Sequence, residues 1–221
     1  MANPPDSFLT LAAPATGSFK DRGSKFLAYA YPVRSEEAAM ACVEGLRREH
    51  FKARHHCFAW RLGLDGQRFR ANDDGEPSGT AGRPILGQID AAGLTDVVVV
   101  VVRYFGGTLL GTSGLIQAYR ESAADALRQG QVVEQIVQDR FLARAPYALV
   151  PDVMNAIRKL DLEIRSEAYD DTGGQLVLEI RQSEVADKLL GLRALLWKVS
   201  AEEARTLAWP EGILIEQTDA L

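Results

Sequence analysis

Six consecutive valines, at positions 97–102, limit the fold of this chain more than any other feature. β-Branched side chains favour strands, and successive side chains of a strand point to opposite faces of its sheet. A strand with one face in solvent would alternate apolar and polar residues, which this run does not do. The run therefore predicts a strand that is covered on both faces.

The residues around this run predict a mixed α and β unit. We expect strands at 25–31 and 53–62, a helix at 36–48 between them, and a helix from about 115 to 128 after the valines. Along the strand at 53–62, alternate side chains point to opposite faces. One set is expected to fill a core and comprises His56, Phe58, Trp60 and Leu62. The other set is smaller and more polar, and comprises His55, Cys57, Ala59 and Arg61.

Composition changes near residue 136, where we place a boundary between domains at 1–135 and 136–221. The 221 residues suffice for one large domain or two small ones, at about 100–200 residues per domain. Residues 1–135 carry 15 basic and 15 acidic side chains, whereas residues 136–221 carry 10 and 15. The whole net charge of −5 therefore belongs to the second part. This balance argues against a protein that coats duplex nucleic acid through a strongly basic surface.

The second part reads as strand, helix, strand, strand, helix, strand, an order typical of a ferredoxin-like α+β fold. Alternating apolar residues predict strands at 141–147, 164–168 and 176–180, with a hairpin turn between the last two. Pro151 suits a first helical position and Ser183 a helix cap, and residues 205–209 are expected to close the pattern. This part contains no nucleophile–base pair or metal-ligand spacing. We interpret it as a packing or partner-binding module.

The overall composition, 47% hydrophobic and 25% charged, is that of a globular protein and excludes a disordered, collagen-like or coiled-coil chain. Cys42 and Cys57 are too few for a disulfide framework and are interpreted as small buried apolar residues. We see no secretory signal at the start, and no apolar run approaches the length of about 18 residues that crosses a membrane. We therefore expect a cytoplasmic protein without membrane contacts.

The first of three motifs that could carry chemistry is Asp73-Asp74-Gly75-Glu76-Pro77-Ser78-Gly79-Thr80-Ala81-Gly82. Its three carboxylates could hold Mg²⁺ through one or two ligands plus water. They could also belong to a solvated loop whose turns are set by glycine and proline. The ligand set is not fixed, so we assign no metal site. The density of Gly, Pro, Ser and Thr favours a loop with a specific binding conformation.

The second motif is the glycine-rich segment from Arg103 to Gly114, between the valine strand and a helix. Backbone N–H groups of glycines and of a helix start can bind an anion. Arg103 could clamp a phosphate, and Tyr104 or Phe105 could stack on a base. The segment is neither a Walker A loop nor Gly-x-Gly-x-x-Gly. The alternative is a tight strand-to-helix turn with buried aromatic side chains.

The third motif is His55 with Cys57 on one face of a strand. Their Cα atoms are expected to lie about 6.5–7 Å apart. This separation is long for a catalytic Cys–His hydrogen bond. We interpret His55 as a structural histidine rather than a catalytic one, with contact to an anionic ligand as the intermediate alternative.

Together these residues resemble the YigZ/IMPACT family. The blocks that carry the resemblance are His55-x-Cys57-x-Ala59-x-Arg61, the whole first motif followed by Pro84, and Arg103-Tyr104-Phe105-Gly106-Gly107-x-x-Leu110-Gly111 with Ala118-Tyr119. Ser24-Lys25-Phe26 also fits. The blocks span about residues 18–128. The remainder is similar, less distinctively, to the small domain that bacterial members append.

The resemblance implies an α+β protein with an N-terminal ribosomal-protein-like βαβ domain, as in domain four of elongation factor G, and a ferredoxin-like C-terminal domain. It implies translation regulators among the eukaryotic relatives, which bind a protein partner. For bacterial members, association with RNA or the ribosome is the usual proposal. The sequence departs from the family pattern at two places. Gly111-Thr112-Ser113-Gly114 stands for the family's Gly-x-Gly-Gly, and Gln117 stands where a basic residue is common. The loss of that cation weakens a phosphate clamp at the helix, unless Arg120 compensates from another face.

We therefore expect a non-catalytic, translation-associated protein that binds RNA, the ribosome or a translation factor and uses no cofactor. The alternative is a hydrolase or other small-molecule enzyme that uses a cleft formed by the same three motifs. A third interpretation gives the acidic C-terminal domain to a protein partner. The residues predicted to bind ligand or nucleic acid are Lys25, His55, Arg61, Asp74, Glu76, Ser78, Thr80, Arg83, Arg103, Tyr104, Gly106, Gly107, Gly111, Gly114 and Tyr119.

Overall fold

The computed structural model describes residues 6–218 and confirms the α+β class. The chain forms two compact units. The N-terminal unit spans Ser7–Gln135, and the C-terminal unit contains residues 136–218 together with Asp6. Among the described residues, no helix is long and apolar enough to cross a membrane.

A five-stranded antiparallel sheet organises the N-terminal unit, in the order β2-β3-β6-β4-β5. Its strands are β2 (Ala15–Asp21), β3 (Ser24–Pro32), β4 (His55–Leu62), β5 (Arg68–Asn72) and β6 (Val97–Tyr104). β6 is antiparallel to both β3 and β4, so these two strands run parallel on either side of it. Helix α1 (Glu36–Glu49) joins them, which gives the βαβ arrangement that the family resemblance implied.

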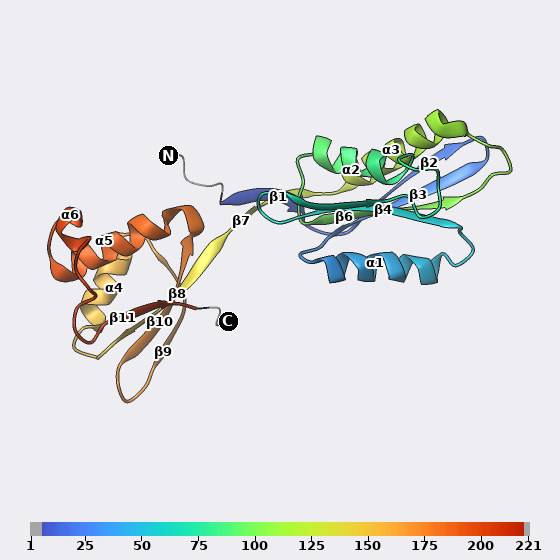
Figure 1. Cartoon of the computed structure of the whole chain (residues 1–221). Helices are drawn as coiled ribbons and strands as arrows, with labels where there is room; N and C mark the ends of the chain where they lie inside the picture. The colour runs from blue at the N-terminus through green and yellow to red at the C-terminus, as the bar shows by residue number, and fades with distance from the viewer. Residues whose placement is uncertain (1–5, 219–221) are drawn as a thin grey trace. The chain divides into compact units, whose positions relative to one another are not determined.

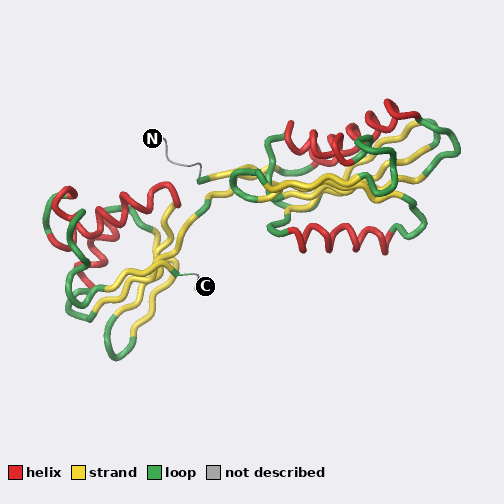
Figure 2. The backbone as a smooth tube through the Cα atoms, in the orientation of Figure 1, coloured by secondary structure: helices red, strands yellow, loops and turns green. Residues whose placement is uncertain are grey.

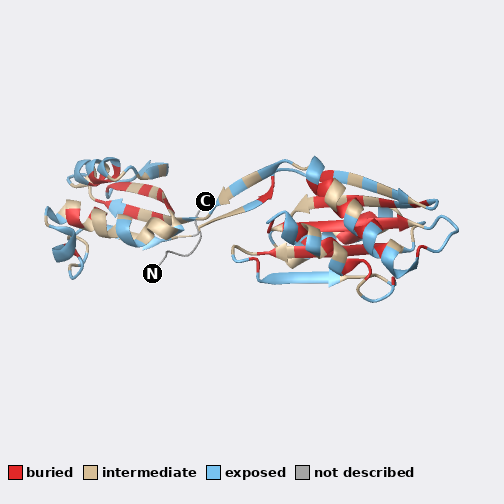
Figure 3. Ribbon diagram, turned by 90° about the horizontal axis from the view of Figure 1, so that it is seen from above, coloured by how far each residue is buried: buried red, intermediate tan, exposed pale blue. Residues whose placement is uncertain are grey.

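Helices cover both faces of this sheet (Figures 1 and 2). Helix α1 lies on one face, and α2 (Gly82–Ala91) and α3 (Gly111–Gln129) lie on the other. All six valines are fully buried, and Figure 3 shows the buried residues along the central strands. Val98, Val100 and Val102 belong to the core under α1, whereas the intervening valines belong to the core under α2 and α3. The prediction of a strand covered on both faces is confirmed.

Helix α2 was not expected, because the turn-rich stretch from Asn72 to Pro84 overlaps its start and its cap comes from outside the helix. The Asp73 carboxylate accepts hydrogen bonds from the backbone N–H groups of Ala81 and Gly82 at 3.0 and 2.8 Å. A Cβ at Gly82 would lie 2.5 Å from the backbone nitrogen of Asn72, so only glycine fits there. Helix α3 also differs from the expectation, since it begins at Gly111 rather than near residue 115.

The first and last strands of the N-terminal unit pair with each other. β1 (Ser7–Leu11) and β7 (Val132–Ile136) form a separate two-stranded sheet. The backbone N–H of Ala12 donates to the carbonyl oxygen of Gln131 at 2.9 Å beside this pair. The unit therefore starts and ends at neighbouring points.

The C-terminal unit has the predicted order of elements. Its antiparallel sheet runs β11-β8-β10-β9, formed by β8 (Gln138–Ala145), β9 (Glu163–Tyr169), β10 (Gly174–Arg181) and β11 (Leu214–Gln217). Helices α4 (Val150–Lys159), α5 (Val185–Trp197) and α6 (Ala201–Ala204) lie on one side of it (Figure 1). Residues alternate along β10, and the side chains of Leu176, Leu178 and Ile180 enter an apolar core with α4 and α5.

Two local predictions in this unit were wrong. The last strand lies at 214–217 instead of 205–209. Ser183 does not cap α5, because it lies in the short 3-10 helix η1 (Gln182–Glu184) and its hydroxyl hydrogen-bonds the carboxylate of Asp6. Local residue preference suggested a cap there, and a contact with a distant part of the sequence took the side chain instead.

Candidate functional site

A cleft of about 820 Å³ lies at the end of the N-terminal sheet where β4 begins and β6 finishes. All three sequence motifs contribute to it. We call it the motif cleft, and its lining residues are Lys52, Arg54, His55, Glu76, Pro77, Arg103, Tyr104, Phe105, Leu109, Leu110, Gly111, Thr112 and Leu115.

A buried ion pair stands in the wall of the motif cleft. Arg103 Nη1 donates to Glu76 Oε1 at 2.6 Å, and the two side chains are only 7% and 4% exposed. The Tyr119 hydroxyl donates to the same oxygen at 2.8 Å. A lone buried charge is strongly unfavourable, so each member of this pair depends on the other.

Aromatic rings enclose the guanidinium of Arg103. Its central carbon lies 5.4 Å from the ring centroid of Phe26 and 5.6 Å from that of Phe105, distances suited to cation–π attraction. Nε of Arg103 is buried and has no hydrogen-bond partner among the described residues. This donor is an exception to the rule that buried polar atoms are paired.

Cys57 lies beneath the cleft as an unreactive thiol. It is fully buried and donates its single proton to the carbonyl oxygen of Asp73 at 2.9 Å, and its Sγ lies 3.3 Å from the Tyr119 hydroxyl oxygen. Burial raises the pKa of Cys57, and burial likewise raises the pKa of Tyr119. Both groups therefore stay protonated, and Cys57 has little thiolate character. Its interpretation as a buried apolar residue agrees with this environment.

The aspartates of the first motif hold the loop in place. The Asp73 carboxylate accepts three backbone hydrogen bonds, from Gly79, Ala81 and Gly82. Burial alone would raise the pKa of Asp73, but these hydrogen bonds outweigh it and lower the pKa. Asp74 accepts 2.7 Å hydrogen bonds from Arg47 Nη2 and from the backbone N–H of His56.

Because of these contacts, both carboxylates face the loop's own donors and the neighbouring elements. Over residues 6–218, no group of three His, Cys, Asp or Glu side chains is placed to hold a metal ion.

His55 has a defined proton arrangement. Its Nδ1 lies 2.9 Å from the carbonyl oxygen of Asp74, which can only accept, so Nδ1 carries the proton. In the neutral imidazole, Nε2 is then an acceptor. His56, on the opposite face of β4, is buried in the core under α1, and burial lowers its pKa. His55 therefore lines the motif cleft, whereas the adjacent His56 is buried in the core under α1.

The open part of the motif cleft is positively charged. Lys52 and Arg54 are exposed on its rim. Gly111 and Thr112 bring the start of α3 into the lining, and this helix has neither a side-chain cap nor an acidic residue in its first turn. The free N–H groups and the dipole of a helix start favour an anion.

Five predicted site residues meet in this cleft: His55, Glu76, Arg103, Tyr104 and Gly111. Tyr119 supports them through Glu76. Gly106 and Gly107 form the turn from β6 toward α3. A Cβ on Gly106 would lie 2.0 Å from the carbonyl carbon of Gly23, so the turn requires glycine for this close approach.

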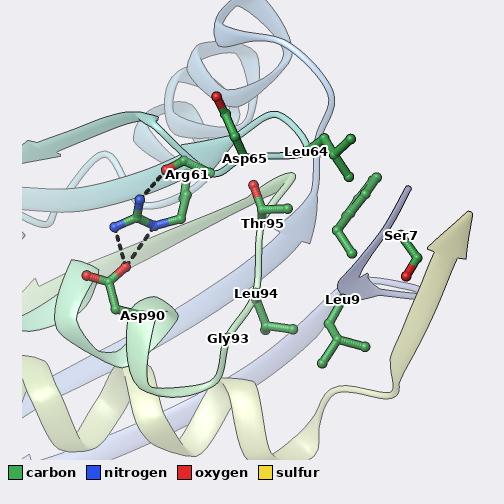
Figure 4. A pocket seen from close by; sticks show the side chains of 11 residues that line it. Ser7, Leu9, Arg61, Leu64, Asp65, Asp90, Gly93, Leu94 and Thr95 are labelled. Carbon is green, nitrogen blue, oxygen red and sulfur yellow. Dashed lines mark hydrogen bonds and ion pairs between the residues drawn. The ribbon is translucent and has the colours of Figure 1, made fainter. Parts of the chain in front are cut away.

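Arg61 does not join the motif cleft, although it shares a face of β4 with His55. Six residues along a strand correspond to about 20 Å, which takes Arg61 to the far end of the sheet. There it lines a different pocket with Leu9 and Thr95, and it forms an ion pair with Asp90 at 2.6 Å (Figure 4).

Six more predicted residues lie outside the lining. Asp74 anchors the loop, and the buried Thr80 hydroxyl donates to the carbonyl oxygen of Pro77 at 2.7 Å. The others are Lys25, Ser78 and Arg83, which are exposed, and Gly114, which is half-buried in α3. Sequence reasoning missed Lys52, Arg54 and Thr112. The signal for the two cations was their position directly before the His55 motif.

Comparison with known proteins agrees with the motifs. Residues 22–127 match the Impact N-terminal domain family. The Escherichia coli protein IMPACT family member YigZ is 47% identical over 166 residues, which are 74% of this chain and 81% of that protein. The Saccharomyces cerevisiae Protein IMPACT homolog is 39% identical over 102 residues, 44% of this chain and 39% of that protein. A crystal structure of a hypothetical protein, 33% identical, aligns with 96% of this chain and 97% of its own at a TM-score of 0.65.

Proposed function

This chain belongs to the IMPACT family, and on that premise we propose that it is a translation-associated regulator that binds RNA through the motif cleft. The observation that carries the proposal is the meeting of three family motifs in one cleft with a cationic rim. The family resemblance supports the translational role, and the chemistry of the cleft supports RNA as the ligand.

That chemistry suits a short stretch of single-stranded RNA. Lys52 and Arg54 offer cations to phosphates, and the side chains of Tyr104 and Phe105 offer rings on which a base can stack. Phe105 is 56% exposed, which leaves its ring accessible. The N-terminal part of the sequence has no net charge, so the contact is local and covers few phosphates.

Charge reversal at the rim tests the proposal. We expect Lys52→Glu/Arg54→Glu to weaken binding of a fluorescent single-stranded RNA by at least about tenfold, since attraction at two phosphates becomes repulsion. The matched control is Arg34→Glu, an exposed cation beyond the other end of β3. Co-sedimentation with ribosomes provides the second readout.

Salt dependence is the further criterion. Binding of the unchanged protein should weaken with a log–log slope of about −0.7 per phosphate contacted. Equal losses in the rim variant and in Arg34→Glu, or binding that does not respond to salt, would contradict RNA binding at the motif cleft.

One observation favours a second candidate function, a hydrolase or other small-molecule enzyme. The cleft volume of about 820 Å³ lies in the range of small-ligand sites, and His55 lines it with an Nε2 that, in the neutral imidazole, could accept a proton. A substrate screen that compares the unchanged protein with His55→Ala separates the two functions. Turnover that His55→Ala abolishes, with its circular dichroism spectrum unchanged, would establish the enzyme.

A further inference from the structure

We propose that the start of α3 and Arg103 form a subsite for a terminal phosphate monoester of a ribonucleotide, at an RNA end or on a free nucleotide. This inference rests on the proposed function and specifies which part of an RNA the motif cleft takes. It follows from three features: a helix start, a buried arginine with an unpaired donor, and two acceptors in the same cleft.

The helix start provides the first phosphate donors. Gly111 and Thr112 line the cleft, and the first N–H groups of a helix have no partner within it. A phosphate monoester carries a charge of about −1.5 to −2, against −1 for an internal phosphodiester. The dipole and the cations Lys52 and Arg54 therefore attract the terminal group more strongly than an internal one.

Arg103 provides an independent indication of an anion. Its side chain is only 7% exposed and lines the same cleft, and Nε lacks a partner among the described residues. Glu76 takes a single guanidinium nitrogen, Nη1. Phosphate oxygens are the acceptors that a guanidinium fork binds through two donors. Since Arg103 and the start of α3 line the same cleft, a phosphate bound there can accept from guanidinium nitrogens that Glu76 does not take.

Two acceptors in the cleft point to a ribose beside that phosphate. Oε1 of Glu76 takes both of the hydrogen bonds described for this carboxylate, from Arg103 and Tyr119, which leaves Oε2 to accept another. His55 Nε2 is the second acceptor. A ribose carries hydroxyl donors next to its phosphate, and the 2′-hydroxyl distinguishes RNA from DNA. A ligand made only of phosphate groups lacks the hydroxyl donors that these two acceptors would bind.

The test measures binding of the full chain to oligoribonucleotides of one sequence with a 5′-phosphate, a 3′-phosphate or hydroxyl ends, and to AMP and adenosine. We expect one phosphorylated end to bind at least about tenfold more tightly than hydroxyl ends, and AMP more tightly than adenosine. The matching phosphorylated DNA should bind more weakly. Comparison of these ligands shows whether the subsite binds the phosphate of a 5′ end, of a 3′ end or of a mononucleotide.

Two glutamate variants in the first turn of α3 provide a matched pair. Thr112→Glu places a carboxylate in the cleft and should abolish the preference for phosphate. Ser113→Glu places the same charge on the next exposed residue, which is outside the lining, and should retain the preference. Acidic residues in a first turn stabilise a helix, so both variants should fold.

The outcomes separate the two proposals. Equal, salt-dependent binding of phosphorylated and hydroxyl-ended RNA overturns the phosphate subsite and leaves RNA binding at the cleft standing. A preference for AMP over adenosine without binding of any oligonucleotide supports the subsite and overturns the proposed function. A phosphate preference that Thr112→Glu retains, or equal binding of phosphorylated DNA, overturns the subsite or its ribose contacts respectively.

Discussion

The two units bury different kinds of residue. Among the described residues, every buried polar or charged side chain lies in the N-terminal unit, whereas the core of the C-terminal unit is apolar. Buried polar groups are unfavourable unless paired, and they hold one specific arrangement when they are. The costly buried polar contacts therefore belong to the N-terminal unit, where the Glu76–Arg103 pair lies beside the motif cleft, and the second unit relies on ordinary apolar packing.

The largest expected effect comes from breaking the buried ion pair. Glu76→Leu leaves Arg103 buried without its counter-charge and should lower the free energy of unfolding of the N-terminal unit by about 3–5 kcal/mol. Urea unfolding measures this through Trp60 fluorescence in a Trp197→Phe/Trp209→Phe background. The C-terminal comparison is Arg140→Leu, followed through Trp197 and Trp209 in a Trp60→Phe background. Its partner Glu179 is 10% exposed, while Arg140 itself is 31% exposed.

The control for this prediction is the double variant Glu76→Leu/Arg103→Leu. Replacing both charges by apolar side chains should recover most of the loss, because no buried charge is then unpaired. If Glu76→Leu costs no more than Arg140→Leu, the contrast between the two units is wrong.

A smaller effect on the free energy of unfolding should distinguish the N-terminal sheet, covered on both faces, from the C-terminal sheet, covered on one. Val100→Ala and Val101→Ala should each cost about 2 kcal/mol, since both neighbours on β6 are buried, on opposite faces. On β10 the two faces should differ: about 2–5 kcal/mol for Leu178→Ala in the core, and less than about 0.5 kcal/mol for the half-buried Val177→Ala. Urea unfolding of the four variants tests this, and equal costs along β10 would remove the distinction.

The smallest effect concerns pH. Burial lowers the pKa of His56 below its usual value near 6.5, although the Asp74 carboxylate acts in the opposite direction. As the pH falls through about 6.5, His56 becomes protonated in the unfolded chain but stays neutral in the folded chain. The N-terminal unit therefore becomes less stable as the pH falls. Urea midpoints at pH 7.5 and 5.5 should show this loss, and His56→Leu should abolish it.

The C-terminal unit supplies the pH control, since residues 136–218 contain no histidine. In a Trp60→Phe background, fluorescence of Trp197 and Trp209 reports on this unit. Its urea midpoint should stay nearly constant over the same interval. A parallel decline in both units would show that His56 does not set the response.

Much of the fold could be predicted from local pattern, and the exceptions share a physical cause. The valine run and the strands of the C-terminal unit follow from side-chain periodicity, which the chain carries locally. Helix α2 has Gly82, Pro84 and Gly87 in its sequence and takes its cap from Asp73, nine positions before Gly82, so its local helix signal is weak and rests on the i, i+4 pair Ile85 and Ile89. Ser183 is the converse case, in which a local cap signal was overridden by a distant carboxylate.

The site shows the same limit. The family resemblance identified His55, Glu76 and Arg103 as residues of one site, and the fold places all three in the motif cleft. Strand periodicity correctly placed Arg61 on the same face of β4 as His55. A shared face tells which side of the sheet a side chain points to, but it does not tell how far apart two side chains lie along the strand. Lys52 and Arg54 belong to no periodic pattern, because exposed cations on a rim need none.

The pairing of β1 with β7 makes the N-terminal unit suitable for circular permutation and for insertion into another protein. Its two ends already lie side by side, so a short linker could close it into a ring with little further loss of chain entropy. New termini could then be opened at an exposed turn, as in circular permutation. The same adjacency would let the unit be inserted into a loop of another protein as a self-contained folding unit.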